Sequence, residues 1–178
     1  MKWLGLRWMG RFLAVLVLCV SVWAAPPERF VARVSHVTDG DTLWVEPQGG
    51  GSPRKLRLLG IDAPEICQNG GTASRAALQT MVAHRRVEVQ VAFNDSYERG
   101  LASIYLDGQD VAATMVLSGQ AWAERWHNRI GRFEAQEADA RAAGRGLFAD
   151  PLAELPRDFR RRHGSCQTPG QPPLAEPR

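Results

Sequence analysis

The segment RVEVQVAF, residues 86–93, constrains the fold more than any other, because its side chains alternate strictly between polar and apolar types. Val87, Val89, Val91 and Phe93 fall on one face of an extended chain, a period of two that no α-helix can bury on one side. We therefore expect a β-strand with one face against a hydrophobic core.

Other segments extend this pattern into a complete fold. Short β-rich runs bounded by Gly, Asp or Pro predict four more strands, at residues 29–37, 41–47, 54–61 and 99–106. Apolar residues at helical spacing predict three helices, at residues 72–84, 110–119 and 129–143. Thr72 or Ser74 could cap the first helix, and Gly119 is placed to end the second. This order predicts an α+β protein, a five-stranded OB-fold β-barrel with three helices packed on it.

The first 24 residues read as a targeting segment. Three basic residues precede an apolar run at 12–20, and small residues follow it. This arrangement predicts a secretory signal peptide cleaved after Ala24, which implies a periplasmic or secreted protein with no stable membrane association. The alternative of an uncleaved anchor is disfavoured, because the run is shorter than the roughly 20 apolar residues that span a bilayer. A lipid anchor at Cys19 is disfavoured by the bulky Leu18 before it.

Removal of this segment changes the charge of the chain. The full sequence has a formal net charge of +3 and a pI of about 9.1. The segment carries three basic residues and no acidic ones, so the remaining chain has equal numbers of each. The basic pI is therefore no argument for a nucleic-acid partner, which has to be argued from local motifs.

After Ala24 the chain holds two cysteines, Cys67 and Cys166. In an exported protein they predict one disulfide, which closes a loop of about 100 residues and stabilises the fold by on the order of 4–5 kcal/mol in the chain-entropy model. Two free thiols, or a reactive Cys67, are the alternatives. The pair has no zinc-site spacing.

Acidic residues gather where two predicted strands end. Asp39 and Asp41 form the turn DGD, while Asp62 and Glu65 follow a strand in the motif DAPE. If neighbouring strands bring the two motifs together, their oxygen atoms favour a hard cation such as Ca²⁺, and Arg57 could grip a phosphate through its planar fork. The plainer alternative is a hairpin turn, a polar loop and a surface ion pair.

The order and spacing of four motifs resemble the staphylococcal nuclease (thermonuclease) family. They are DGDT at residues 39–42, RLLGIDAPE at 57–65, YERGLASIYLDG at 97–108 and GLF at 146–148, and the resemblance covers residues 30–148. It implies an OB-fold enzyme that hydrolyses phosphodiester bonds of DNA and RNA with Ca²⁺ as cofactor.

The resemblance also implies a metal site. Asp41 and Asp62 correspond to direct ligands, and the backbone carbonyl of Ala63 corresponds to a third ligand. Asp39 corresponds to a residue that lies next to the ligands without binding the metal directly. The family often has threonine in place of Ala63, but alanine supplies the same carbonyl.

The implied catalytic residues are Glu65, as general base for the attacking water, with Arg57 and Arg99 as phosphate ligands. Glu98 stands where the family has glycine, and its carboxylate could compete with phosphate for Arg99. Trp126 could stack on a base of the substrate, or be an ordinary surface aromatic.

These features predict three regions, namely the signal peptide at 1–24, a nuclease-like domain at 25–150, and a Pro/Arg-rich tail at 151–178 that is partly disordered. The basic run at 157–162 is either solvated, or an arm that attracts phosphate, or a segment held beside the active site by the disulfide. We expect a monomeric calcium-dependent nuclease that acts on DNA and RNA and prefers single strands. A catalytically inactive OB-fold module that binds nucleic acid or protein is the alternative, although such a module would be expected to lose Glu65 or an arginine.

Overall fold

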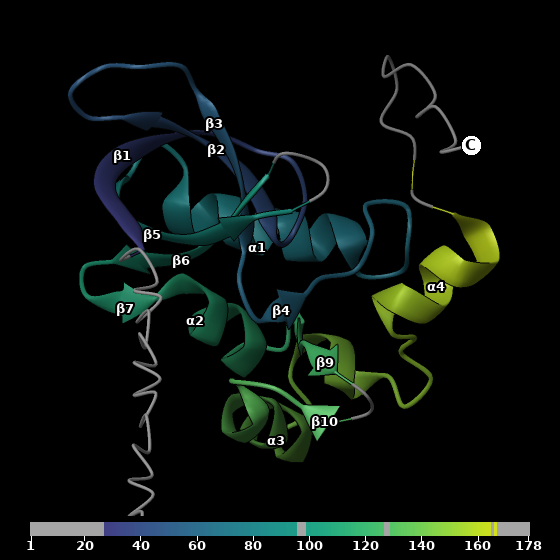
Figure 1. The fold of residues 1–178 in the computed structure, drawn as a ribbon. Coiled ribbons are helices and arrows are strands. Elements are labelled where there is room, and N and C mark those ends of the chain that lie inside the picture. The colour runs from purple at the N-terminus through teal and green to yellow at the C-terminus, as the bar shows by residue number, and fades with distance from the viewer. Residues whose placement is uncertain (1–26, 96–98, 127–128, 165, 167–178) are drawn as a thin grey trace, which may run out of the picture.

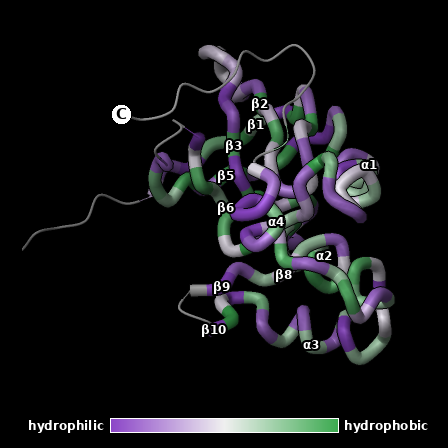
Figure 2. Tube along the Cα trace, turned by 90° about the vertical axis from the view of Figure 1, so that its right-hand side faces the viewer, coloured by the Kyte–Doolittle hydropathy of each residue, from purple (hydrophilic) through white to green (hydrophobic). Residues whose placement is uncertain are grey.

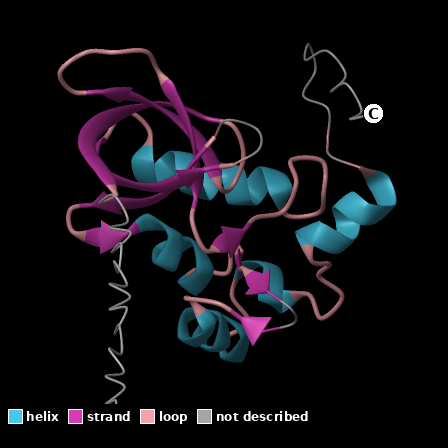
Figure 3. Ribbon diagram, viewed as in Figure 1, coloured by secondary structure: helices cyan, strands magenta, loops and turns pink. Residues whose placement is uncertain are grey.

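The computed structural model describes residues 27–95, 99–126, 129–164 and 166. Its centre is a closed β-barrel (Figures 1 and 3). The barrel strands are β1 (Glu28–Val37), β2 (Thr42–Pro47), β3 (Arg54–Leu58), β5 (Arg86–Asn94) and β6 (Gly100–Leu106). They lie in the order β3-β2-β1-β5-β6, with antiparallel neighbours, and the barrel closes where β3 pairs in parallel with β6. The predicted five-stranded α+β barrel is thereby confirmed.

The inner face of the barrel is the apolar face that the alternation predicts, with one exception. Val87, Val89 and Val91 of β5 are buried, but Phe93 is 57% exposed. The pairing of β5 with β6 shifts register between Val91 and Phe93. An extra residue at such a bulge turns the side chains after it to the opposite face, so the prediction that Phe93 is inward-facing was wrong.

The strand predicted at residues 54–61 is interrupted near its end. A turn at Gly60, whose φ is +85°, separates β3 from β4 (Ile61–Asp62). Glycine adopts this conformation at little cost. β4 pairs with β8 (Trp122–Ala123) rather than with a barrel strand, which carries Asp62 away from the barrel wall.

The described part of the chain contains four α-helices rather than the three predicted. They are α1 (Gly71–Val82), α2 (Val111–Leu117), α3 (Glu134–Ala142) and α4 (Pro156–His163), with a 3-10 helix η1 (Gly146–Ala149) between the last two. The N-cap of α1 is Gly70, without a side-chain cap, so neither Thr72 nor Ser74 has the predicted role. Gly119, with φ of +72°, follows α2 as expected.

The third helix starts later than predicted. Residues 129–130 form β10 (Arg129–Ile130), which pairs with β9 (Arg125–Trp126), and the N–H of Gly131 donates to the carbonyl of Glu124 at 2.9 Å. These bonds commit the backbone to a hairpin before α3 begins. A further short strand, β7 (Gln109–Asp110), pairs with β6.

The fourth helix, α4, lies at the right of Figure 1, beyond the loop that joins β4 to α1. It is strongly hydrophilic, as its colour in Figure 2 shows, and of its residues only Pro156 is buried. Within the described ranges, no helix has the length and apolar character needed to cross a membrane. The predicted signal peptide and residues 167–178 of the tail lie outside the described residues.

Candidate active site and metal centre

The turn between β1 and β2 brings the first acidic pair against the chain that follows β4. Within it, Asp39 Oδ1 accepts the backbone N–H of Asp41 at 3.0 Å. A Cβ atom on Gly40 would lie 1.8 Å from Ser74 Oγ and 2.8 Å from the Cβ of Ala63. The turn can approach these neighbours only because it has no side chain at its centre.

Asp41 is buried, and both of its carboxylate oxygens accept hydrogen bonds. Its Oδ1 accepts from Thr42 Oγ1 at 3.0 Å and from Arg57 Nη1 at 2.5 Å, and its Oδ2 accepts the backbone N–H of Ala63 at 2.9 Å. Burial raises the pKa of Asp39 to about 7, and the charge of Asp41 adds to this rise. Burial and the charge of Asp41 thus both disfavour the ionised form of Asp39.

Arg57 joins the two acidic motifs. Its Nη1 bonds Asp41, and its Nη2 lies 3.0 Å from Asp62 Oδ1. Burial acts to lower the pKa of Arg57, but the carboxylates of Asp41 and Asp62 outweigh it and raise that pKa above its ordinary value. The guanidinium is thus a permanent cation at the point where the two carboxylates meet.

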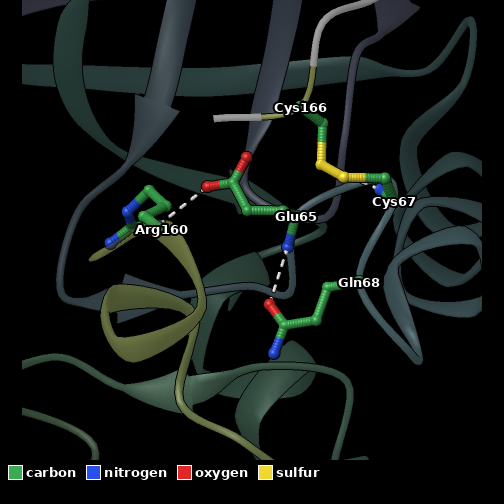
Figure 4. The surroundings of a disulfide bond; sticks show 5 residues. All are labelled: Glu65, Cys67, Gln68, Arg160 and Cys166. Carbon is green, nitrogen blue, oxygen red and sulfur yellow. Dashed lines mark hydrogen bonds and ion pairs between the residues drawn. A yellow bond between two sulfur atoms is a disulfide. The ribbon is translucent and has the colours of Figure 1, made fainter. Parts of the chain in front are cut away.

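Glu65 occupies the loop that leads from β4 into α1. A Cβ on Gly71 would lie 1.9 Å from the carbonyl oxygen of Glu65, so glycine lets the helix start pack on this loop. Gln68 accepts the Glu65 N–H at 3.2 Å through Oε1, and its own N–H donates to the Glu65 carbonyl at 2.8 Å (Figure 4). Its Nε2 also donates to the carbonyl of Glu154 at 2.7 Å, which ties the loop to the segment before α4.

A second arginine, Arg160 of α4, reaches the same acidic residues. Its Nη1 lies 2.9 Å from Glu65 Oε1 (Figure 4). Nη1 also lies 3.2 Å from Asp62 Oδ1, and Nη2 lies 3.2 Å from Asp62 Oδ2. Burial acts to lower the pKa of Arg160, but hydrogen bonds to Asp62 and Glu65 raise it overall. In the sequence, residues 157–162 form one charge run, and no local motif distinguishes Arg160 within it.

The disulfide between Cys67 and Cys166 is present, which confirms that prediction. The two Cα atoms are 5.8 Å apart, and the N–H of Cys67 lies 3.1 Å from Cys166 Sγ (Figure 4). Because Cys67 follows Glu65 by two residues, the bond holds Cys166, just after α4, beside the loop that carries Glu65. This was the sequence signal that α4 lies here.

Arg99 immediately precedes β6, in which Leu101 pairs with Arg57 of β3. Its Nε and Nη2 lie 2.8 and 2.7 Å from Asp95 Oδ2. Its role as a phosphate ligand stays a prediction, as does any competition from Glu98, which lies outside the described residues.

A cleft of about 150 Å³ opens beside these groups. Its lining comprises four arginines, two acidic residues and three apolar ones, namely Arg57, Arg125, Arg157, Arg160, Asp62, Glu124, Trp122, Ala123 and Leu155. Burial raises the pKa of Glu124, a residue that the sequence analysis did not single out. Glu124 lies beside Asp62 because β4 pairs with β8, a pairing that no local sequence motif predicts.

The side chain of Trp126, the candidate for base stacking, lies outside what the structure describes.

A larger cavity, about 600 Å³, lies between η1, α4 and the loop before α1, where Leu147, Leu152 and Phe159 contribute to its wall. None of the residues predicted for the site lines it. Of the residues predicted for the site, Arg57 and Asp62 line the smaller cleft.

In the described ranges, no group of three or more His, Cys, Asp or Glu side chains could hold a metal ion. The predicted ligand set needs only two carboxylates, and Asp41 and Asp62 already share one cationic partner, Arg57. Carboxylate oxygens supplemented by a backbone carbonyl and water are the ligands that hard ions take.

Comparison with known proteins gives the family. The model described as "Staphylococcal nuclease homologue" matches residues 55–150. An "Uncharacterized endonuclease" of Haemophilus influenzae is 33% identical over 84% of this chain and 83% of its own. "Protein ParB" of Escherichia coli is 34% identical over 89% and 92%, and a "Micrococcal nuclease" of Shigella flexneri 32% over 83% and 87%. With a barrel of the expected topology and a family match over more than half of its length, the chain belongs to the staphylococcal nuclease family of hydrolases.

Proposed function

We propose that the protein is a calcium-dependent endonuclease that hydrolyses phosphodiester bonds of DNA and RNA and prefers single strands. One observation carries the proposal. Asp41, the motif that contains Arg57, Asp62 and Glu65, and Arg160 of α4 come from three separate parts of the chain, yet a continuous set of ion pairs joins them. Membership of the nuclease family supports the reaction class, and several similar proteins are named as nucleases.

The carboxylates of Asp41 and Asp62 would hold the metal, together with the backbone carbonyl of Ala63, while Asp39 orients the turn through its bond to the Asp41 N–H. We favour Ca²⁺ because this set offers oxygen ligands alone. When bound, the ion would supply Lewis-acid stabilisation of the charge that develops on the phosphate.

The other residues have roles that follow from their chemistry. Glu65 would accept the proton of the attacking water, a contribution of roughly 10²–10⁴-fold. Arg57 and Arg99 would grip the phosphate oxygens, where planar, permanently charged donors stabilise a transition state that is more negative than the substrate.

We further propose that the protein is exported to the periplasm or secreted, and that it acts as a monomer. The Cys67–Cys166 disulfide supports an oxidising compartment, and the basic and apolar pattern of residues 1–24 supports export.

The test is cleavage of heat-denatured DNA and of RNA by the purified protein, with Ca²⁺ or with EGTA. Glu65→Gln should lower kcat by about 10²-fold or more with little change in KM. Glu88→Gln, an exposed glutamate on β5, is the matched control and should behave as wild type. Undiminished cleavage in EGTA would refute calcium dependence. Calcium binding without cleavage by the folded wild type would favour the inactive binding module.

A further inference from the structure

We propose that Arg160 is a positioning residue of the metal site. Arg160 holds Asp62 and Glu65 while no metal is bound, and it competes with the metal for Asp62. The Cys67–Cys166 disulfide keeps it in place. The inference rests on the proposed function for the identity of the ion, but its geometry is independent of that function.

The contact engages both oxygens of Asp62. Arg160 donates to Oδ1 through Nη1 and to Oδ2 through Nη2, and Arg57 donates to Oδ1 as well. Two guanidinium groups therefore neutralise one carboxylate. An ion that took an Asp62 oxygen as ligand would lie next to both positive charges, so Arg160 has to withdraw for the metal to bind well.

The position of Arg160 is fixed from both sides along the chain. Before α4, the carbonyl of Glu154 accepts a hydrogen bond from Gln68, and after α4, Cys166 bonds to Cys67. Both anchors belong to the loop that carries Glu65. A helix tied down at both ends keeps its arginine at a high effective concentration over these carboxylates, which a free tail would not do.

The neighbouring basic residues of α4 are arranged differently. Arg161 is 76% exposed and pairs with Asp158 one turn earlier, whereas the Arg160 side chain is only 32% exposed. Arg160 contacts Asp62, and Arg161 offers a matched control on the same helix.

The size of the effect follows from the competition. If the ion pair leaves Asp62 available in only about one fifth of molecules, the apparent Kd for metal is about fivefold weaker than that of the open site. Arg160→Gln removes the competing charge but keeps a polar side chain. We therefore expect it to tighten Ca²⁺ binding about fivefold, and Arg161→Gln to leave the Kd within about twofold.

Isothermal titration of the full oxidised protein with Ca²⁺ measures this without any reliance on catalysis. Removal of the disulfide, by Cys67→Ser with Cys166→Ser, should also tighten binding. In the Arg160→Gln background the same change should have no further effect, because the disulfide acts through Arg160. If α4 had a purely structural role, the effect of the disulfide on Ca²⁺ binding would not depend on the presence of Arg160.

Unchanged or weaker Ca²⁺ binding by Arg160→Gln would overturn the inference, as would a disulfide effect that persists without Arg160. Asp41→Asn separates this inference from the proposed function. If binding survives Asp41→Asn but Arg160→Gln still tightens it, the proposed ligand set fails and the competition stands. If Asp41→Asn abolishes binding and Arg160→Gln leaves it unchanged, the metal site stands and the role of Arg160 fails.

Discussion

Replacement of Glu137 by glutamine is expected to destabilise the protein and to disturb the site from a distance. Glu137 lies in α3 and is buried. Its Oε1 accepts from Arg125 and, at 2.8 Å, from Arg141 Nε, while its Oε2 accepts the backbone N–H of Ala123 at 2.9 Å. One carboxylate therefore satisfies two guanidinium groups and one backbone donor.

The cost follows from what the substitution leaves behind. The Arg125 side chain is 13% exposed, so Glu137→Gln leaves its charge largely out of water without a counter-ion. Loss of one partner of a buried ion pair costs about 3–5 kcal/mol. The Arg141 side chain is 48% exposed and adds little, since water compensates it. Glutamine can still accept the N–H of Ala123. We therefore expect the free energy of unfolding to fall by about 3 kcal/mol, the lower end of that range.

The site should respond because Ala123 pairs with Ile61, the residue before Asp62. If β8 becomes less ordered, its pairing with β4 weakens, and the predicted metal ligand Asp62 in β4 becomes less well positioned. Urea unfolding measures the stability, and Ca²⁺ titration measures the site. Glu134→Gln, an exposed position one turn earlier on α3, is the control and should cost less than about 1 kcal/mol. Equal losses for the two variants would refute the buried-network argument.

Three further predictions concern other contacts. Loss of the Cys67–Cys166 disulfide, whose residues are 99 apart, should lower the free energy of unfolding by about 4–5 kcal/mol in urea denaturation. Gly40→Ala should cost about 1–3 kcal/mol in the same assay and weaken Ca²⁺ binding, because its Cβ would collide with Ser74 Oγ. Arg57→Lys should lower kcat by roughly 10²-fold, measured by steady-state kinetics, because a single ammonium cannot reproduce the planar fork.

Much of the barrel could be predicted from the sequence, because an alternating strand fixes which side chains face the core. The alternation of Val87, Val89 and Val91 decides one wall of the barrel. The same rule failed at Phe93, since a bulge is set by the pairing partner and leaves no local trace. The position of Asp41 beside Arg57 could be predicted, because Asp41 adjoins β2 and Thr42 of β2 pairs with Arg57 of β3. Asp62 lies in β4, whose pairing with β8 has no local sequence signal.

Arg160 shows where prediction from local pattern stops. Within residues 157–162, the sequence alone does not distinguish one arginine from another. Which arginine contacts the acidic residues depends on how the helix is rotated over the Glu65 loop. Once the disulfide and the helix are known, periodicity narrows the choice, because Arg157 and Arg160 are three residues apart, share one face and line the same cleft. The contact with Asp62, 98 residues away along the chain, then selects Arg160. A disulfide close to a predicted catalytic motif is therefore a reason to examine the charged residues that it brings near that motif.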